Sequence, residues 1–269
     1  MIKIDGQPIE IGSFPDGTIF VKYDTMGRQK VGHAKLTWYY ENDREFLTLM
    51  YLVKHLRAHD VNDIYLYMPY IPNARMDRVK NPEDVFTLKY FAELLNSLNL
   101  TRVEVLDPHS SVSEALINNL CIIPPKEYIS ETLGRIAPYD HFKKNIVMFY
   151  PDEGAMKRYA GMVNLPYAFG IKRRNWETGV IEGLDVAGAA DQIAGKDILI
   201  VDDICSRGGT FLHSAKKLKE LGANDIYLFI SHCENTILEG GLLKGDLIKR
   251  VYTTNSIFTK SHEKIEVMK

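Results

Sequence analysis

Short apolar runs alternate along the chain with longer stretches in which apolar residues recur at helical spacing. The longer stretches predict helices, and the short runs predict strands covered on both faces, as in parallel sheets. The predicted strands are 63–68, 102–106, 146–150, 167–171, 198–201 and 226–230. The predicted helices are 45–57, 85–98, 113–120, 153–162 and 211–221. This order indicates an α/β protein with mostly parallel sheets flanked by helices.

The same alternation of strands and helices occurs in both halves of the chain, and two consecutive prolines, Pro124 and Pro125, separate them. We therefore expect two α/β domains, residues 1–123 and 124–269. A chain of 269 residues is long enough to bury a core in each. The last nineteen residues are less regular and rich in lysine at their ends, so we expect them to fray.

The composition fits a cytoplasmic enzyme. A formal net charge of −2 gives no overall attraction to nucleic acid or to a membrane surface. The three cysteines are far apart and lack C-x-x-C spacing, so we expect neither a disulfide framework nor a zinc site. The sequence shows no signal peptide and no apolar run long enough to span a bilayer. We therefore expect a cytoplasmic protein without nucleic-acid or membrane partners.

The most informative segment begins with the predicted strand 198–201, which Asp202 and Asp203 follow directly. A polar loop then leads into the next predicted helix, and it contains Ser206, Arg207, Gly208, Gly209 and Thr210. Ligands of α/β sheets bind at the carboxyl ends of strands, and helix N-termini attract anions. The loop thus offers donors for a phosphate, and the adjacent carboxylates offer acceptors for sugar hydroxyls or ligands for a cation. This combination predicts a ribose-phosphate site.

Two other interpretations explain less of this segment. A Walker B strand also ends in acidic residues, but no G-x-x-x-x-G-K-[ST] loop precedes this one. The two acids also suit a purely structural turn. Such a turn leaves the following Gly-Gly-Thr and helix unexplained.

Charged residues also follow two predicted strands of the first half. Arg75, Asp77 and Arg78 come soon after one strand, where two arginines around an aspartate form a fork-shaped anion binder. His109 follows the next strand in an Asp-Pro-His sequence and suits a phosphate or metal ligand. A solvated charged loop is the alternative for each motif taken alone.

Two further motifs lie in the second half. Asp152 follows a predicted strand and begins a helix, so it suits either a helix cap or a ligand. Lys172 and Arg174 belong to a basic triplet after the strand 167–171. We expect a mobile loop there, whose cations match the charge that builds up during phosphoryl transfer. A solvated basic loop is again the alternative.

Together and in this order, the motifs resemble the ribose-phosphate diphosphokinase (phosphoribosyl-diphosphate synthetase) family. The matching motifs are Phe14-Pro-Asp16-Gly17, Asn73-Ala-Arg75-Met-Asp77-Arg78, Asp107-Pro-His109, Pro151-Asp152, Lys172-Arg173-Arg174 and the loop from Asp202 to Thr210. The resemblance implies two phosphoribosyltransferase-like domains of the type I fold and a homo-oligomer, either a dimer or a hexamer. It also implies transfer of the β,γ-diphosphate of MgATP to the anomeric hydroxyl of ribose 5-phosphate.

The resemblance implies a role for each motif. Catalytic cations that close over the transferring phosphates are implied at Lys172 and Arg174. Magnesium ligands, direct or through water, are implied at His109 and Asp152. Contacts to ATP are implied for Phe14, Asp16, Arg75, Asp77, Arg78 and His109. Contacts to the ribosyl phosphate are implied for Asp202, Asp203, Ser206, Arg207, Gly208, Gly209 and Thr210.

The chain departs from the family pattern in the phosphate loop. The family usually has Asp-Thr-Ala-Gly-Thr where this chain has Ser-Arg-Gly-Gly-Thr, so an acid is lost at Ser206 and a cation is gained at Arg207. The two glycines and the arginine would suit an acceptor with an extended 5-phosphate, such as ADP-ribose, as in the branch that makes ADP-ribose pyrophosphate for NAD salvage. We rank ribose 5-phosphate first and ADP-ribose second. A non-catalytic regulatory or RNA-binding protein on the same fold ranks third.

Overall fold

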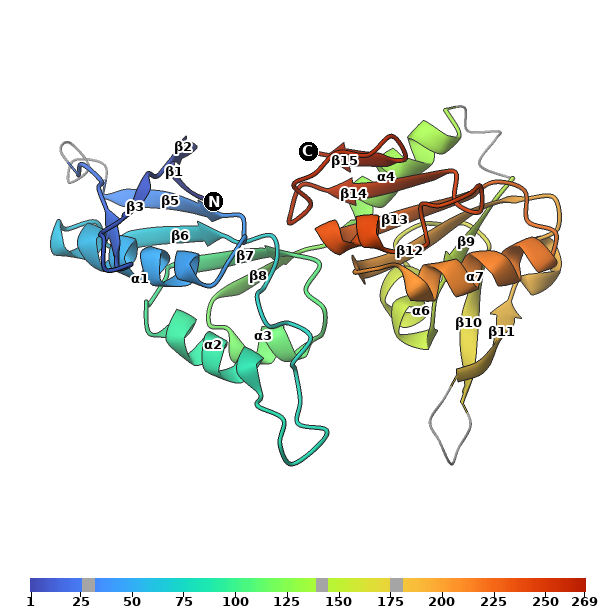
Figure 1. The fold of residues 1–269 in the computed structure, drawn as a ribbon, viewed down its shortest axis with the longest axis horizontal. Helices are drawn as coiled ribbons and strands as arrows, with labels where there is room; N and C mark the ends of the chain where they lie inside the picture. Colours follow the sequence, from blue (N-terminus) through green and yellow to red (C-terminus); the bar gives the residue numbers. More distant parts are fainter. Residues whose placement is uncertain (26–31, 139–144, 175–180) are drawn as a thin grey trace. The chain divides into compact units, whose positions relative to one another are not determined.

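The computed structural model describes residues 1–25, 32–138, 145–174 and 181–269. They form two compact units, Met1–Pro124 and Pro125–Lys269, each with its own sheet and helices (Figure 1). The sheets are mostly parallel, which confirms the α/β class predicted from the alternating pattern.

The first unit contains a six-stranded sheet in the order β2-β1-β5-β6-β7-β8. Its strands are β1 (Ile2–Ile4), β2 (Gln7–Pro8), β5 (His33–Trp38), β6 (Asp63–Tyr67), β7 (Arg102–Leu106) and β8 (Leu120–Ile123). The strands from β5 to β8 are parallel, and β1 pairs antiparallel with both of its neighbours. A hairpin, β3 (Ile11–Ser13) and β4 (Ile19–Val21), and three helices complete the unit. The helices are α1 (Arg44–Ala58), α2 (Thr87–Asn96) and α3 (Val112–Leu116).

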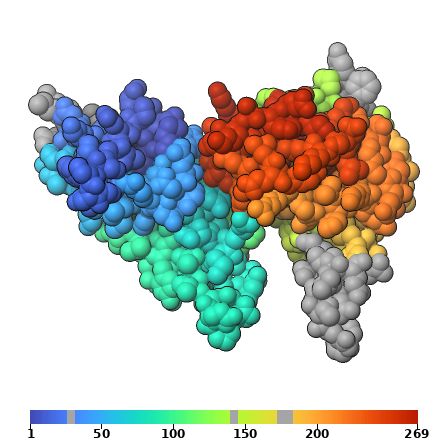
Figure 2. Space-filling view, in the orientation of Figure 1, coloured from blue at the N-terminus to red at the C-terminus, as the bar shows by residue number. Residues whose placement is uncertain are grey.

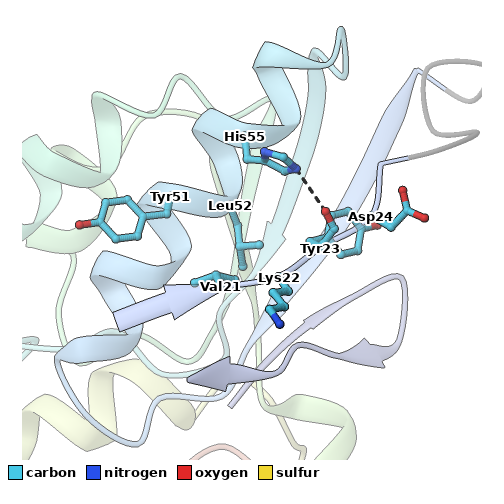
Figure 3. Close-up of a pocket in the computed structure, with 7 residues that line it drawn as sticks. All are labelled: Val21, Lys22, Tyr23, Asp24, Tyr51, Leu52 and His55. Atoms are coloured by element: carbon cyan, nitrogen blue, oxygen red, sulfur yellow. Dashed lines mark hydrogen bonds between the residues drawn. The ribbon is translucent and has the colours of Figure 1, made fainter. Parts of the chain in front are cut away.

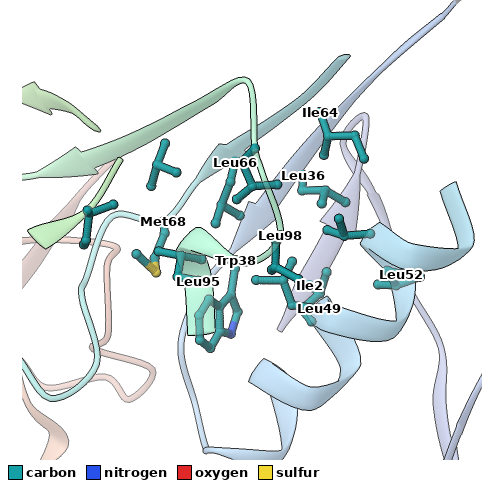
Figure 4. Close-up of a cluster of buried hydrophobic side chains, with 14 of the residues drawn as sticks. Ile2, Leu36, Trp38, Leu49, Leu52, Ile64, Leu66, Met68, Leu95 and Leu98 are labelled. Atoms are coloured by element: carbon teal, nitrogen blue, oxygen red, sulfur yellow. The ribbon is translucent and has the colours of Figure 1, made fainter. Parts of the chain in front are cut away.

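Buried and more exposed residues alternate along the strands of this unit, and the buried ones form its core. Trp38 on β5 and Leu66 on β6 are buried, with more exposed residues on either side along each strand. Helix α1 contributes Leu49 and Leu52, which helical spacing places on one face, to the same core (Figure 4). The buried carboxylate of Glu45 is satisfied there, because the Trp38 indole nitrogen donates to it at 2.9 Å and the N-terminal amine also binds it.

The second unit contains a seven-stranded sheet in the order β11-β10-β9-β12-β13-β14-β15, in which only the β10–β11 pair is antiparallel among the described residues. Its strands are β9 (Ile146–Tyr150), β10 (Tyr167–Arg174), β11 (Ile181–Gly188), β12 (Asp197–Cys205), β13 (Ile226–Cys233), β14 (Arg250–Thr254) and β15 (Ile265–Met268). Its helices are α4 (Lys126–Ile136), α6 (Glu153–Tyr159), α7 (Gly209–Glu220) and the 3₁₀ turns η2 (Ala190–Gln192) and η3 (Asn235–Glu239).

Both faces of this sheet are covered, as the apolar run in β12 predicts. Ile198 and Ile200 belong to one core cluster, together with Phe211 and other residues of α7. Leu199 and Val201, which alternation directs to the other face, belong to a second cluster with residues of α4 and α6. The sheet is therefore a middle layer between helices.

The hairpin of β10 and β11 is joined to the sheet over a short length. In the described part of the chain, β10 pairs with β9 from Tyr167 to Phe169 and with β11 from Ala168 to Arg174. Gly170 lies where β10 continues past β9, and a Cβ on it would come 2.6 Å from the Pro151 carbonyl oxygen. Only glycine fits there.

The secondary structure predicted for residues 113–120 and for the C-terminal residues is wrong. The helix predicted over 113–120 ends at Leu116, because Ile117 is extended and Leu120 already begins β8, which pairs with β7. The C-terminal residues, which we expected to fray, form β15 beside β14. Both errors arise from strand pairing that local sequence does not reveal. None of the described helices combines the length and apolar character that spanning a bilayer requires.

Candidate functional site

Asp202 and Asp203 lie within strand β12, not after it as the sequence suggested. The strand continues to Cys205 because β13 pairs with it throughout, with Asp202 opposite Ile230 and Cys205 opposite Cys233. On its other side β12 pairs with β9 only as far as Ile200 in the described residues. The two carboxylates therefore lie on a stretch of strand that extends beyond β9.

A third carboxylate acts on this pair. Burial raises the pKa of Asp202 well above its usual value, and the negative charges of Asp203 and Asp152 raise it further. Asp152 is the N-cap of α6, where its Oδ1 accepts the Ala155 N–H at 3.1 Å. Asp203 is buried, and its Oδ2 lies 3.9 Å from Nη1 of Arg158. The charges of these three carboxylates, at the carboxyl ends of β9 and β12, thus interact, and such a group suits hydroxyl donors.

Replacing Asp202 by asparagine is expected to raise the melting temperature at neutral pH while impairing function. The pKa of this carboxyl is higher in the folded than in the unfolded state, so its contribution favours folding at low pH and is lost as the pH rises through the folded pKa. At neutral pH the charged group therefore opposes folding. A gain of about 1 kcal/mol would correspond to roughly 2–4 °C in a domain of this size.

Melts of Asp202→Asn over a range of pH without magnesium test this expectation, and the gain should shrink as the pH falls. Asp246→Asn is a matched control, because Asp246 is fully exposed in the same unit. A variant that melts below the wild type at neutral pH would contradict the proposed repulsion.

The loop after β12 leads into the N-terminus of α7. Gly208 is the N-cap with φ of +77°, and no side chain caps the helix. A Cβ on Gly208 would lie 2.7 Å from the Leu242 side chain. Glycine at 208 is thus required by the backbone and by Leu242, whereas a Cβ on Gly209 would meet no atom within 4 Å. Gly209 and Thr210 are exposed at the first turn of the helix, whose N–H groups suit a phosphate.

Two side chains of the loop are bound by carboxylates that the sequence analysis missed. Ser206 Oγ donates to Oε2 of Glu234 at 2.6 Å. Arg207 Nη2 donates to Oε2 of Glu239 at 3.1 Å, in a pair that is mostly exposed. Both glutamates come from the segment after β13, and no local sequence signal connects them with the loop.

In the first unit, the structure brings together the motifs that follow β6 and β7. Asp77 is buried and accepts hydrogen bonds from Nε and Nη2 of Arg78, at 2.8 and 3.1 Å. These bonds lower the pKa of Asp77, and the positive charges of Arg78 and His109 lower it further. The side chain of Arg78 is 63% exposed, and Arg75 is exposed as well. The segment between β6 and α2 that carries them projects from the unit (Figures 1 and 2). This arrangement provides cations for an anion in solvent.

Phe14 and Asp16 lie at the turn of the β3–β4 hairpin. Phe14 is 53% exposed and packs against Phe20 with ring centroids 5.0 Å apart. Asp16 accepts from the Thr18 hydroxyl and N–H at 2.7 and 2.9 Å, which lowers its pKa. The turn thus presents an aromatic face to solvent.

The basic triplet does not form the loop that the sequence predicted. Lys172 and Arg174 belong to β10, where they pair with Leu184 and Ile181 of β11, and the register shifts between Arg173 and Arg174. The side chains of 172–174 lie outside the described part of the structure.

A cavity of about 610 Å³ lies elsewhere in the first unit, between β4 and α1 (Figure 3). Its lining residues are Val21, Lys22, Tyr23, Asp24, Tyr51, Leu52 and His55. His55 Nε2 lies 3.2 Å from the Tyr23 carbonyl oxygen. None of the motif residues lines this cavity among the described residues.

Comparison with known proteins supports the resemblance. Ribose-phosphate pyrophosphokinase of Cereibacter sphaeroides is 30% identical over 245 residues, which span 88% of this chain and 68% of that protein. The enzyme of the same name from Bacillus caldolyticus is 29% identical over 234 residues, or 83% of this chain and 70% of that protein. No family model matches.

A solved structure shows the same fold. The crystal structure of phosphoribosylpyrophosphate synthetase from Mycobacterium smegmatis aligns with a TM-score of 0.76 at 18% identity, covering 97% of this chain and 85% of that one. Both units are therefore phosphoribosyltransferase-like domains, as the resemblance implied. On the strength of the sequence identity and this coverage, the chain belongs to the ribose-phosphate pyrophosphokinase family, a family of diphosphotransferases.

Proposed function

We propose that the protein transfers the β,γ-diphosphate of MgATP to the anomeric hydroxyl of ribose 5-phosphate, giving phosphoribosyl diphosphate and AMP. The observation that carries the proposal is the arrangement at the end of β12, where Asp202 and Asp203 are followed by a glycine loop and the uncapped N-terminus of α7. Relatives named ribose-phosphate pyrophosphokinase support the same activity.

The acceptor would bind at this loop of the second unit. The N–H groups in the first turn of α7 and the exposed Thr210 suit the 5-phosphate, which carries up to two negative charges. Asp202 and Asp203 suit the ribose hydroxyls, because carboxylates accept hydrogen bonds from them. Hydroxyl donors would also reduce the repulsion within the carboxylate cluster.

The donor would bind through the first unit. The exposed side chains of Arg75 and Arg78 suit the phosphates of ATP. Asp77 orients Arg78 by accepting hydrogen bonds from its Nε and Nη2. Phe14 offers an exposed ring on which adenine can stack. By the family likeness, that adenine belongs to a neighbouring subunit, so we propose a homo-oligomer, and size-exclusion chromatography with light scattering measures its size.

The residues present fit magnesium. Asp152 supplies hard oxygen donors of the kind that this ion prefers, and its negative charge contributes to the raised pKa of Asp202. Within the described residues, no three His, Cys, Asp or Glu side chains are arranged to hold a metal on their own. Asp152 would hold the ion in the second unit, and His109 would act in the first, directly or through water. The ion, when bound, would neutralise charge on the phosphates of ATP.

The chemistry predicts a product that separates this activity from an ordinary kinase. Transfer of a diphosphate releases AMP, whereas transfer of one phosphate releases ADP. We expect AMP from MgATP only when ribose 5-phosphate is present, together with a product that is heavier by one diphosphate. Mass spectrometry of reactions with ribose 5-phosphate, with ADP-ribose and without an acceptor makes the measurement.

The reaction without an acceptor is the control for hydrolysis. Release of ADP would overturn the proposal. A product formed with ADP-ribose but not with ribose 5-phosphate would show that ADP-ribose is the acceptor. No nucleotide product under any condition would favour a non-catalytic protein on this fold.

A further inference from the structure

The segment Glu234–Leu242, which follows β13, packs directly against the phosphate loop. A Cβ on Gly240 would come 1.9 Å from the Arg207 carbonyl oxygen, and Leu242 occupies the space beside Gly208. Glu239 binds the Arg207 side chain from the same segment. The loop is therefore supported along its length by residues about thirty positions later in the sequence.

Among the described residues, Glu234 makes the shortest hydrogen bond between the segment and the loop. Its Oε2 accepts the Ser206 hydroxyl at 2.6 Å and the Thr236 hydroxyl at 3.0 Å. Its backbone N–H donates to the Cys205 carbonyl oxygen at 2.8 Å, which continues the pairing of β13 with β12. Backbone and side chain of Glu234 thus hold two successive residues of the loop.

The position of Glu234 is itself fixed on both sides. Before it, His232 is buried and its Nδ1 lies 2.9 Å from the Ser256 Oγ, which donates to the Ser231 carbonyl oxygen at 3.1 Å. After it, Asn235 exchanges two hydrogen bonds with Thr259, at 2.9 and 3.0 Å. A carboxylate held in this way is preorganised, so little entropy is lost when it binds Ser206.

The hydrogen bond also decides what Ser206 does. A serine hydroxyl has one proton, and here it is donated to Glu234, which leaves only lone pairs for a ligand. A phosphate oxygen needs a donor. Ser206 therefore serves the shape of the loop in this arrangement, and the phosphate is left to the backbone N–H groups of α7. The acid that the family usually has at this position is replaced by a carboxylate from another segment.

We propose that Glu234 is a positioning residue for the ribosyl-phosphate acceptor. Through Ser206 it fixes the backbone between β12 and α7, so that the N–H groups at the start of α7 converge on the 5-phosphate. This inference rests on the proposed function, because it concerns the same acceptor. It assigns to Glu234 an effect on acceptor binding that does not extend to ATP.

Steady-state kinetics of Ser206→Ala, Glu234→Ala, Glu234→Gln and the double alanine variant test the proposal. Hydrogen bonds to charged groups contribute about 1.5–3 kcal/mol, so either alanine variant should raise the KM for ribose 5-phosphate by about tenfold or more. The KM for ATP should stay at the wild-type value. The double variant should be no worse than either single one, because both remove the same bond. Glutamine keeps an acceptor oxygen and should restore much of the loss.

Glu220→Ala is the matched control, since Glu220 is an exposed glutamate at the other end of α7. The proposal would be overturned if the alanine variants kept the wild-type KM for ribose 5-phosphate. It would also be overturned if the effects of the two alanine substitutions on this KM were additive, or if the KM for ATP rose by the same factor. A lower KM in Glu234→Ala would also overturn it, because the carboxylate would then compete with the phosphate. If the wild type forms no AMP, the proposed function fails instead. Calorimetric titration of the same variants with inorganic phosphate then tests the loop alone, and binding as tight in Glu234→Ala as in the wild type overturns the inference.

Discussion

Replacing Lys172 or Arg174 by alanine is expected to lower kcat by on the order of 10²-fold or more, with much smaller changes in the KM for ribose 5-phosphate. Charge accumulates on the transferring phosphates in the transition state, and cations that contact it mainly there raise kcat when present. The proposed acceptor site is in another part of the unit, at the N-terminus of α7. The two kinetic parameters should therefore separate.

Initial rates over a range of both substrates measure this separation. Arg173→Ala is the matched control, because it removes a cation from the same strand, between the two positions, without an implied catalytic role. If Lys172→Ala and Arg174→Ala change only KM, these residues merely bind substrate. Equal losses in all three variants would mean that overall charge on the hairpin matters and that individual positions do not.

The second large effect is expected from Gly240→Ala. The added methyl group would lie 1.9 Å from the carbonyl oxygen of Arg207, which belongs to the backbone of the phosphate loop and cannot rotate away. Overpacking of this kind typically costs about 1–3 kcal/mol. We therefore expect a lower melting temperature and a large rise in the KM for ribose 5-phosphate, since the strain acts on the loop itself.

Gly241→Ala provides a close comparison. A Cβ there would contact only the Leu212 side chain, at an ordinary distance of 3.5 Å, among the described atoms. Melting curves and KM values for the two variants separate the steric effect from the general cost of replacing glycine. Similar behaviour of both variants would show that the segment yields to the loop, and that the close packing has no consequence for the acceptor.

Several strands of both units were predictable because burial makes their residues apolar, although the buried strands β5 and β14 were not predicted. The run 198–201 is apolar because β12 is covered on both faces, and β7 and β9 have the predicted bounds. Charged strand residues were not predictable in this way. Asp202 is in β12 because β13 pairs with it, and Lys172 is in β10 because β11 pairs with it.

The candidate site was predictable only where its residues are close in sequence. The order of strand, acid pair, Gly-Gly-Thr and helix is local in the sequence. The structure contains these residues as the end of β12, the short loop that follows it and the start of α7. Glu234 and Arg158 contact this region from distant positions, and nothing near them in the sequence indicates it. The close packing of Leu242 against Gly208 was not predictable for the same reason.

The β10–β11 hairpin is joined to the sheet by strand pairing over only a short length. Beyond Phe169 its described strands form a two-stranded ribbon, and such ribbons are marginally stable alone. We therefore expect the part of the ribbon that carries Lys172 and Arg174 to open without breaking the ladders between β9 and β12. Local opening of this ribbon should therefore require less free energy than unfolding of the core. Hydrogen exchange measures this free energy. Backbone amides beyond Phe169 should exchange through local opening, at a lower free energy than global unfolding. Protection of these amides equal to that of the β12 amides would refute the expectation.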